Sequence, residues 1–458
     1  MHKLLFSLFV VLALSVGACG SSQPSEGAYD DERDYIDDDT LEAFDQDLRA
    51  LSLAISQSDT DKERAMSRKL SESARLYQRA LLSALYDDSS VSRRTLAAVM
   101  LGFTGDASVI SSLVEKVQDE DEPESVRLNA VLGLSTLGDK LRDYEDHRGL
   151  MRTLATQLES KEASFSMRRA SIMAYAVAFD GAQNDGILPL RDRFLSDPDV
   201  RVQVAAINAM GDIGDTAAVP DLTLVGVDDP NVDIRAASVV ALGKIADPAR
   251  VLPALGHACQ DDSAIVRRHS IDAISKHYGS DPELVYATIL TGMSDFDPRV
   301  REAAALALAR LNDTRAIGAL VQATGDRTAM VREAAAISLG TLITEDREKE
   351  SYPLVDLLAD QNPGVRGAAL ASLTSITRND YGSDQPRWRK FFYDKYPDLD
   401  PKNMYGDGPK PRVSSGISNS GTRRTSGYSQ PRTSSRNTNT RTTNTRNTNT
   451  RTNNSGRR

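Results

Sequence analysis

One stretch near the middle of the 458-residue chain reads Asp197-Pro198-Asp199-Val200-Arg201-Val202-Gln203-Val204-Ala205-Ala206-Ile207. The Asp-Pro pair ends one helix and starts the next, because proline fits the first helical turn, where its missing N–H costs nothing. Val200, Val204 and Ile207 then form an apolar stripe. The alanines between them let neighbouring helices approach closely. The stretch therefore predicts the start of a packed helix.

The pattern of an aliphatic residue followed by arginine returns along the chain. Its arginines are separated by 41, 33, 34, 32, 34, 31 and 34 residues, and they are Arg127, Arg168, Arg201, Arg235, Arg267, Arg301, Arg332 and Arg366. A looser first copy begins at Val91, which makes nine copies within residues 88–380. Each copy predicts a helix, a turn and a second helix. A regular period of this kind predicts an all-α fold, an α-solenoid.

The repeated motif resembles the HEAT repeat, and most closely the short PBS-lyase-like form found in bacterial proteins. The resemblance covers residues 88–380 and implies a superhelix of helical hairpins, an armadillo-type fold. It also implies a concave face that holds a protein or peptide, and we assign that face to the second helix of each repeat. The repeated arginines could form a basic ligand-binding stripe. We interpret them instead as structural residues that pair with turn aspartates and helix ends of the same or the adjacent repeat.

Both ends of such an array need a cap, because each repeat buries its core only against its neighbours. Within residues 41–87, apolar residues at steps of three and four predict a helical hairpin that caps the first repeat. Residues 381–408 contain Trp388, the only tryptophan, and resemble the segment that closes many bacterial HEAT proteins. We expect Trp388, Phe391 and Phe392 to cover the last repeat rather than to bind a ligand.

The first 18 residues have the features of an export signal. Met1-His2-Lys3 supplies a positive start, and the apolar run that follows is too short to span a membrane. Val16-Gly17-Ala18-Cys19 resembles the lipobox of bacterial lipoproteins, which implies cleavage before Cys19 and lipidation of its thiol. Gly20 in the next position resembles lipoproteins that are sent to the outer membrane, which implies the outer rather than the inner membrane. Residues 19–40 then predict an acidic, flexible tether.

The chain ends in a basic segment of different composition. Residues 409–458 contain eleven basic residues and no acid, whereas the whole chain has a net charge of −10. The segment is rich in Ser, Thr, Asn and Arg, so we expect it to be disordered. Evenly spaced arginines make it a candidate binder of polyanions, such as an envelope polymer or nucleic acid, and the most regular are Arg436, Arg441, Arg446 and Arg451. The alternative is a solvated linker with no specific partner.

The sequence offers no recognisable enzyme motif. None of the five histidines belongs to a His-Glu pair, so the resemblance to deoxyhypusine hydroxylase, a HEAT enzyme, fails at its metal-binding residues. His257 and Cys259 stand two residues apart and would point in different directions on a helix. We therefore interpret Cys259 as a structural residue and predict no metal, cofactor, catalytic residue or small-molecule substrate.

These observations predict a membrane-anchored scaffold of the bacterial cell envelope that binds a protein or peptide along the solenoid. The first alternative is a polyanion-binding protein that acts through its basic tail. The second is a relative of the HEAT lyases or hydroxylases that lacks recognisable catalytic motifs.

Overall fold

The computed structural model describes residues 36–87, 89–181 and 186–401. Every regular element within these ranges is a helix, and none of these helices is long and apolar enough to cross a bilayer. The chain divides into two units, residues 1–400 and 401–458. The predicted signal peptide, Cys19, most of the tether and the basic tail with its arginines lie outside the described residues.

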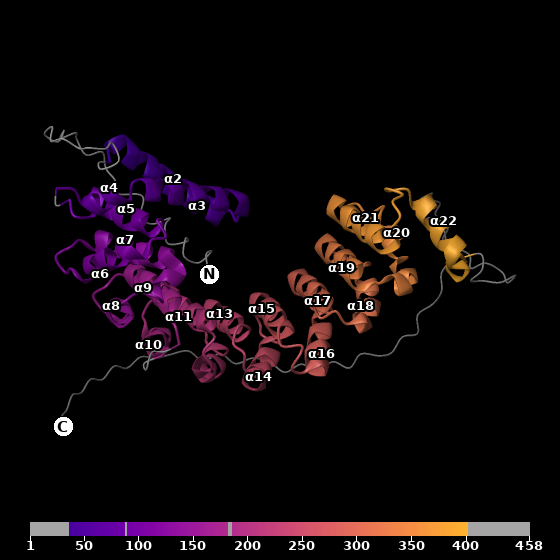
Figure 1. Ribbon diagram of the computed structural model, residues 1–458. Helices are drawn as coiled ribbons and strands as arrows, with labels where there is room; N and C mark the ends of the chain where they lie inside the picture. The colour runs from indigo at the N-terminus through magenta and orange to yellow at the C-terminus, as the bar shows by residue number, and fades with distance from the viewer. Residues whose placement is uncertain (1–35, 88, 182–185, 402–458) are drawn as a thin grey trace, which may run out of the picture. The chain divides into compact units, whose positions relative to one another are not determined.

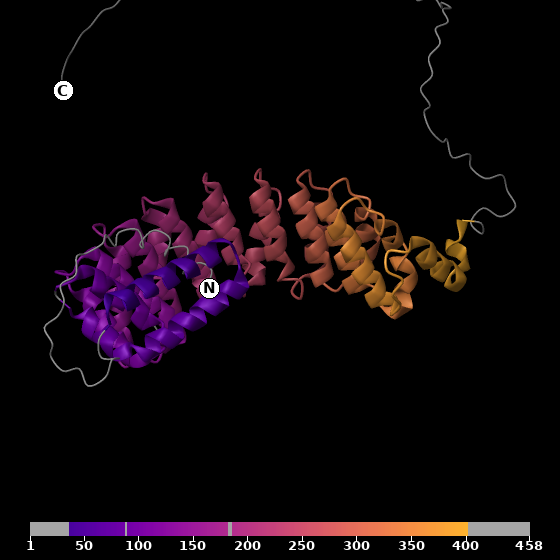
Figure 2. The same cartoon turned by 90° about the horizontal axis from the view of Figure 1, so that it is seen from above.

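Within these ranges, nine helices begin with the repeated motif, and we call them the first helices (Figure 1). They are α5 (Val91–Gly102), α7 (Glu124–Leu137), α9 (Phe165–Ala178), α11 (Val200–Ile213), α13 (Val232–Leu242), α15 (Ala264–Ser275), α17 (Pro298–Arg310), α19 (Ala329–Leu342) and α21 (Pro363–Thr377). Each packs on the next first helix, so that the helices follow one another side by side (Figure 2). The predicted all-α solenoid is confirmed.

Each first helix but the last is followed by a second helix, and each second helix packs mainly on the first helix of the following repeat. The second helices are α6 (Ile110–Gln118), α8 (His147–Glu159), α10 (Leu188–Ser196), α12 (Val219–Asp221) with the π-helical turn η7 (Leu222–Gly226), α14 (Pro248–Ala258), α16 (Pro282–Gly292), α18 (Ile317–Ala323) and α20 (Leu354–Leu357). Short 3-10 helices join them: η4 (Ala107–Val109), η5 (Gly138–Leu141), η6 (Thr216–Ala218), η8 (Thr314–Ala316) and η9 (Glu345–Ser351).

The core runs continuously between the two layers of helices. The aliphatic residue of the repeated motif lies in it in most repeats, as Val266, Val300 and Val365 illustrate with at most 1% exposure, although Val200 is half-buried. Small residues allow the closest approach of first helices: a Cβ atom added to Gly102 would lie 2.6 Å from the Cα atom of Gly133 on the next first helix. The motif thus supplies both the buried stripe and the close packing expected of a solenoid.

The N-terminal cap consists of three helices rather than a hairpin, and they are α2 (Asp38–Ser56), α3 (Thr60–Leu76) and α4 (Gln78–Leu85). The second predicted helix is interrupted at Tyr77. The cap also begins earlier than predicted, since Ile36 is 2% exposed and Asp37 caps α2 by accepting a hydrogen bond from the backbone N–H of Thr40. Acidic residues that suggested a tether stabilise this helix N-terminus instead.

The C-terminal cap contains α22 (Gln385–Lys395) and the 3-10 helix η10 (Pro397–Leu399). Trp388 and Phe392 are fully buried, and Phe391 packs edge-on against Trp388 with ring centroids 6.3 Å apart. The indole N–H of Trp388 donates to the carbonyl oxygen of Gly382 at 2.9 Å. These aromatic side chains therefore serve packing at the end of the array.

Candidate functional site

Most of the repeated arginines join one repeat to the next. Arg267 is typical: its Nε and Nη2 atoms donate to the two carboxylate oxygens of Asp295 in the next repeat at 2.7 and 2.8 Å. Its Nη1 atom donates to the backbone carbonyl of Asp261, whose carboxylate accepts from Arg235 of the preceding repeat. Asp261 therefore serves two arginines. We call this series the arginine ladder.

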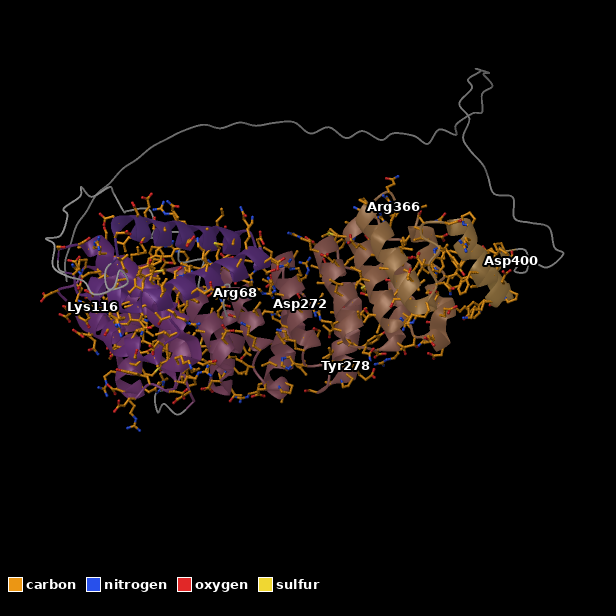
Figure 3. The ribbon with its side chains drawn as sticks, turned by 45° about the horizontal axis from the view of Figure 1, so that its top comes forward. Arg68, Lys116, Asp272, Tyr278, Arg366 and Asp400 are labelled. Atoms are coloured by element: carbon orange, nitrogen blue, oxygen red, sulfur yellow. The ribbon has the colours of Figure 1, made fainter. Side chains whose placement is uncertain are left out.

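The ladder contains five arginine–aspartate links of this kind among the described residues. They are Arg168–Asp197, Arg235–Asp261, Arg267–Asp295, Arg301–Asp326 and Arg332–Asp360. Arg366 ends the series: it is exposed and donates to the carbonyl oxygens of Asp360 and Gln361 (Figure 3). Arg127 makes no such link, and its Nε atom is buried without a hydrogen-bond partner in the part of the chain that is described.

Arg201 also pairs with a turn aspartate, but it does not stand in the ladder. Ladder arginines lie four residues after the residue that caps their helix, as Arg301 does after Asp297. Asp199 caps α11, so the ladder position of that repeat is Gln203, and the ladder is interrupted there. Arg201 instead corresponds to Arg299, and both form bidentate pairs with the capping aspartate of their own helix. The aliphatic-arginine pattern placed this repeat two residues out of register.

The sequence pattern also missed the first link. Arg94, not Arg93, occupies the ladder position of α5, and its Nε atom donates to Glu122 at 3.1 Å. The other carboxylate oxygen of Glu122 accepts from Lys116 at 2.7 Å. All three side chains are buried, at 6–7% exposure. The spacing of four residues from the capping Ser90 would have identified Arg94.

Ladder carboxylates are held in their charged form. A hydrogen bond from Arg267 lowers the pKa of Asp295, and one from Arg332 lowers the pKa of Asp360. An aspartate with a depressed folded-state pKa stabilises the fold above its unfolded-state pKa of about 3.9. That contribution is lost as the pH falls through the lower, folded-state pKa. The ladder is thus fully formed at neutral pH.

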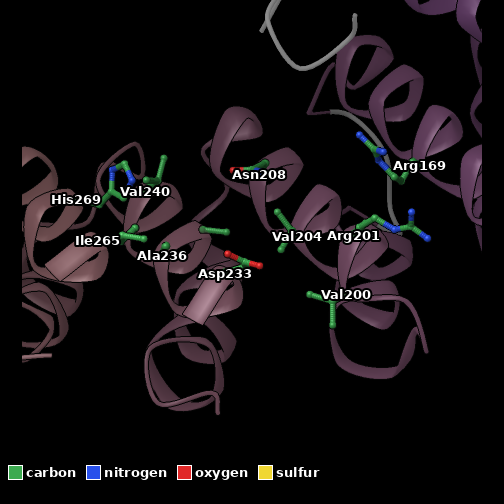
Figure 4. Close-up of a pocket in the computed structure, with 11 residues that line it drawn as sticks. Arg169, Val200, Arg201, Val204, Asn208, Asp233, Ala236, Val240, Ile265 and His269 are labelled. Atoms are coloured by element: carbon green, nitrogen blue, oxygen red, sulfur yellow. The ribbon is translucent and has the colours of Figure 1, made fainter. Parts of the chain in front are cut away.

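A groove with a volume of about 440 Å³ crosses four first helices, α9, α11, α13 and α15 (Figure 4). Side chains from all four helices line it, and they are Arg169, Val200, Arg201, Val204, Asn208, Asp233, Ala236, Ala237, Val240, Ile265 and His269. We call it the first-helix groove. The repeat pattern assigns the concave face to the second helices, whereas this groove is lined by first helices.

Two arginines, Arg169 and Arg201, lie at one end of the groove. The guanidinium group of Arg201 stacks 3.7 Å from the ring centroid of Phe165 and makes a bidentate pair with Asp199. Arg169 lies beside it (Figure 4). Burial, and then the charge of Arg201, lower the pKa of Arg169.

The other end of the groove carries His269 (Figure 4). Burial, and then the neighbouring charge of Arg268, lower the pKa of His269, so the imidazole is neutral at pH 7. The middle is lined by aliphatic and alanine side chains. The groove thus combines an apolar floor with polar groups at defined places, which is the composition of a ligand site.

The other residues considered for chemistry lie apart from the groove. Burial raises the pKa of the Cys259 thiol to about 12, which makes it an unreactive thiol. His257 is exposed and lies 3.2 Å from Asp228. Within the described ranges, no three His, Cys, Asp or Glu side chains are grouped to hold a metal ion.

Two family models match the chain. Residues 286–374 match the model of HEAT repeats, and residues 202–224 match the model of the PBS lyase HEAT-like repeat. The fold is therefore an α-solenoid that contains HEAT repeats, as predicted. No curated protein matches the sequence.

Several solved structures are similar at low identity. Kap95p, in a structure with RanGDP, is 16% identical with a TM-score of 0.47, over 73% of this chain and 49% of Kap95p. An engineered protein is 17% identical with a TM-score of 0.40, over 69% of this chain and 92% of its own. Human deoxyhypusine hydroxylase is 18% identical with a TM-score of 0.25, over 60% of this chain and 97% of the hydroxylase. At this level of similarity, neither the activity nor the partner of these proteins can be assigned to this chain.

Proposed function

We propose that this protein is an exported, lipid-anchored scaffold that binds a protein or peptide in the first-helix groove. The observation that carries the proposal is the groove itself, which four successive repeats build from outward-facing side chains. Solenoids commonly bind partners along an extended face of this kind. The arginine ladder supports the proposal, because its links join α9 to α11 and α13 to α15, two of the three pairs of neighbouring first helices that line the groove, and so help to keep the groove preformed.

The anchor rests on the lipobox-like Val16-Gly17-Ala18-Cys19. Acyl chains on Cys19 would attach the protein to the outer membrane, since each buried methylene contributes about 0.8 kcal/mol. The scaffold would then meet its partner in the cell envelope.

Cys19→Ser is expected to release the protein from the membrane. The full chain and the variant are expressed in a bacterial host, the cells are fractionated, and the N-terminus is analysed by mass spectrometry. The wild type should be acylated and sediment with outer membranes, whereas the variant should be neither. Cys259→Ser, at the only other cysteine, should behave as the wild type. A cytosolic wild type that keeps its first 18 residues would exclude the anchor.

A photo-reactive benzoylphenylalanine at Val240, which lines the groove, is expected to cross-link one discrete partner in cells. The same residue at Leu284, which is 44% exposed on the second helix α16, serves as the control and should give no such adduct. The Val240 adduct should survive deletion of residues 409–458. Equal adducts at both positions would refute binding in the groove.

A second candidate function is polyanion binding through residues 409–458, favoured by their eleven basic residues. In that case the deletion should abolish the interaction, and the affinity should fall steeply with salt.

A further inference from the structure

The last first helix, α21, has a neighbouring first helix on only one side. It packs on α19, whereas each first helix from α7 to α19 packs between two others. In the part of the chain that the structure describes, α22 packs on α20, and no further first helix follows α21 (Figure 1). The C-terminal cap thus continues the layer of second helices, and the layer of first helices ends at α21.

The side of α21 that would face a further first helix can be identified from the preceding pair. The hydroxyl group of Ser372 on α21 donates to the carbonyl oxygen of Ala336 on α19 at 2.9 Å. Ala336 lies eight residues after the residue that caps α19, and the same position in α21 is Leu370. Arg366 and Thr374 lie one helical turn before and after Leu370. We call the side that carries these three residues the open side.

The open side is less covered than its counterparts in other repeats. Ala305 and Ala336 are fully buried, whereas Leu370 at the same position is half-buried. Arg301 is 6% exposed, whereas Arg366 at the same position is classed with the exposed residues. A surface that the other first helices bury against a neighbour is therefore accessible on α21.

The guanidinium group of Arg366 is held as those of the ladder arginines are held. Its Nη1 atom donates to the carbonyl oxygens of Asp360 and Gln361 at 2.8 and 3.1 Å. Arg267 makes the same pair of backbone contacts at the same distances. The Nε and Nη2 atoms of Arg267 then bind Asp295. A guanidinium group fixed in this way binds a carboxylate with little loss of side-chain entropy.

No carboxylate of the described residues is bonded to Arg366. The charge of Asp360 acts on it, but the carboxylate of Asp360 is bonded to Arg332. Asp398 stands in an Asp-x-Asp-Pro sequence like the one that begins α17, yet its carboxylate is bonded to Lys349. The Nε and Nη2 atoms of Arg366 can therefore accept a carboxylate from another molecule.

The ladder defines what a helix must carry to pack on the open side. In each link, the bonded aspartate lies two residues before the capping residue and accepts its backbone N–H, as Asp295 does from Asp297 at 2.8 Å. A small residue follows twelve positions after the aspartate, as Ala307 follows Asp295 and Ser338 follows Asp326. Small residues allow the close approach of two helices. A helix with both features would match both ends of the open side.

We infer that the open side of α21 binds an α-helix of a partner protein as an additional first helix, with an aspartate of its N-terminal turn bound to Arg366. This contact continues the packing of α19 on α21 by one repeat. A second copy of the chain offers no such helix from its described residues, because its first helices are packed in its own array and α4 covers α5. The open side is separate from the first-helix groove, which α9 to α15 line, so the inference goes beyond the proposed function.

The probe that tests the inference is a fluorescent peptide of residues 295–311, which contains α17 and its aspartate turn. A hydrocarbon staple between positions 299 and 306 keeps the peptide helical, because short helices are marginal in water. These positions correspond to Asp233 and Val240, which line the groove and not the contact between first helices. Binding to the full chain is measured by fluorescence anisotropy.

Arg366→Gln should weaken binding of the peptide about tenfold, because it removes a charged bidentate pair. A peptide with Asp295→Asn, which keeps an acceptor for the turn, should lose about as much affinity for the wild type. Both peptides should bind Arg366→Gln equally, since the pair is then already broken. Arg299→Gln in the full chain is the control, because Arg299 is exposed and lies on α17; it should leave the affinity unchanged.

Three results would overturn the inference. The absence of saturable binding would refute the docking of a helix on α21. Equal affinity for the wild type and Arg366→Gln would show that the peptide binds another part of the chain. Equal affinity of the two peptides for the wild type would refute recognition of the aspartate. Each result is independent of the cross-link at Val240, which tests the groove.

Discussion

Arg301→Met is expected to lower the free energy of unfolding by about 3 kcal/mol, because it removes one partner of a buried ion pair. Arg301 is 6% exposed and forms a bidentate pair with Asp326 at 2.8 and 2.9 Å. It also donates to the carbonyl oxygen of Asp295 at 2.8 Å. The substitution would leave the carboxylate of Asp326 without its cation in a largely buried position.

Chemical denaturation followed by circular dichroism measures this effect. Arg299→Met is the control in the same helix, because Arg299 is exposed and pairs only with the capping Asp297 among the contacts described. It should change stability little. The double variant Arg301→Met/Asp326→Asn should recover part of the loss, since it leaves no unpaired buried charge. If Arg301→Met were no worse than Arg299→Met, the ladder would not stabilise the array.

Trp388→Ala is expected to destabilise the C-terminal end by about 3–5 kcal/mol, as for other large aromatic truncations in a core. Trp388 is fully buried and packs edge-on against Tyr381, with ring centroids 4.8 Å apart. Repeats contact mainly their neighbours, so the loss should concentrate in α20–α22 rather than spread through the array. Hydrogen exchange measures protection helix by helix, so it distinguishes α20–α22 from α5 and α7 at the other end of the array.

The control variant is Trp388→Phe, which keeps an aromatic ring and loses the hydrogen bond to Gly382. It should cost about 1 kcal/mol. Protection in α5 and α7 should remain that of the wild type in both variants. Equal loss of protection at the two ends would mean that the array unfolds as one unit and that α22 is not a local cap.

Local sequence determined the helical repeats because their signals lie within a few residues. The capping aspartates and the Asp-Pro turns each act over one helical turn, and the structure contains both. Of the stripe predicted in α11, Ile207 is buried, whereas Val200 and Val204 line the groove. The context of Trp388 also predicts a packing role, and Trp388 is buried.

Features that depend on neighbouring repeats were harder to predict. The aliphatic-arginine pattern places Arg201 in the same class as Arg301. The two differ in their distance from the residue that caps their helix, because Arg201 lies two residues after its cap and Arg301 lies four residues after its cap. The groove combines Arg169 and Ile265, which belong to helices three repeats apart in sequence. No local spacing brings such residues together, because their proximity follows from the stacking of whole repeats.

The arrangement of the ladder has a consequence for how such a chain can change length in evolution. A unit carries its own aspartate six residues before its own arginine, as with Asp261 and Arg267. Duplication or loss of one complete unit therefore leaves every interior charge with a partner, whereas recombination within a unit does not. At the interruption, where Gln203 stands in the ladder position, the carboxylate of Asp229 accepts the backbone N–H of Asn231 at 2.7 Å, as the carboxylates of Asp261 and Asp295 do from the residues two positions after them. Gene duplication can thus lengthen this array by whole repeats without a compensating substitution.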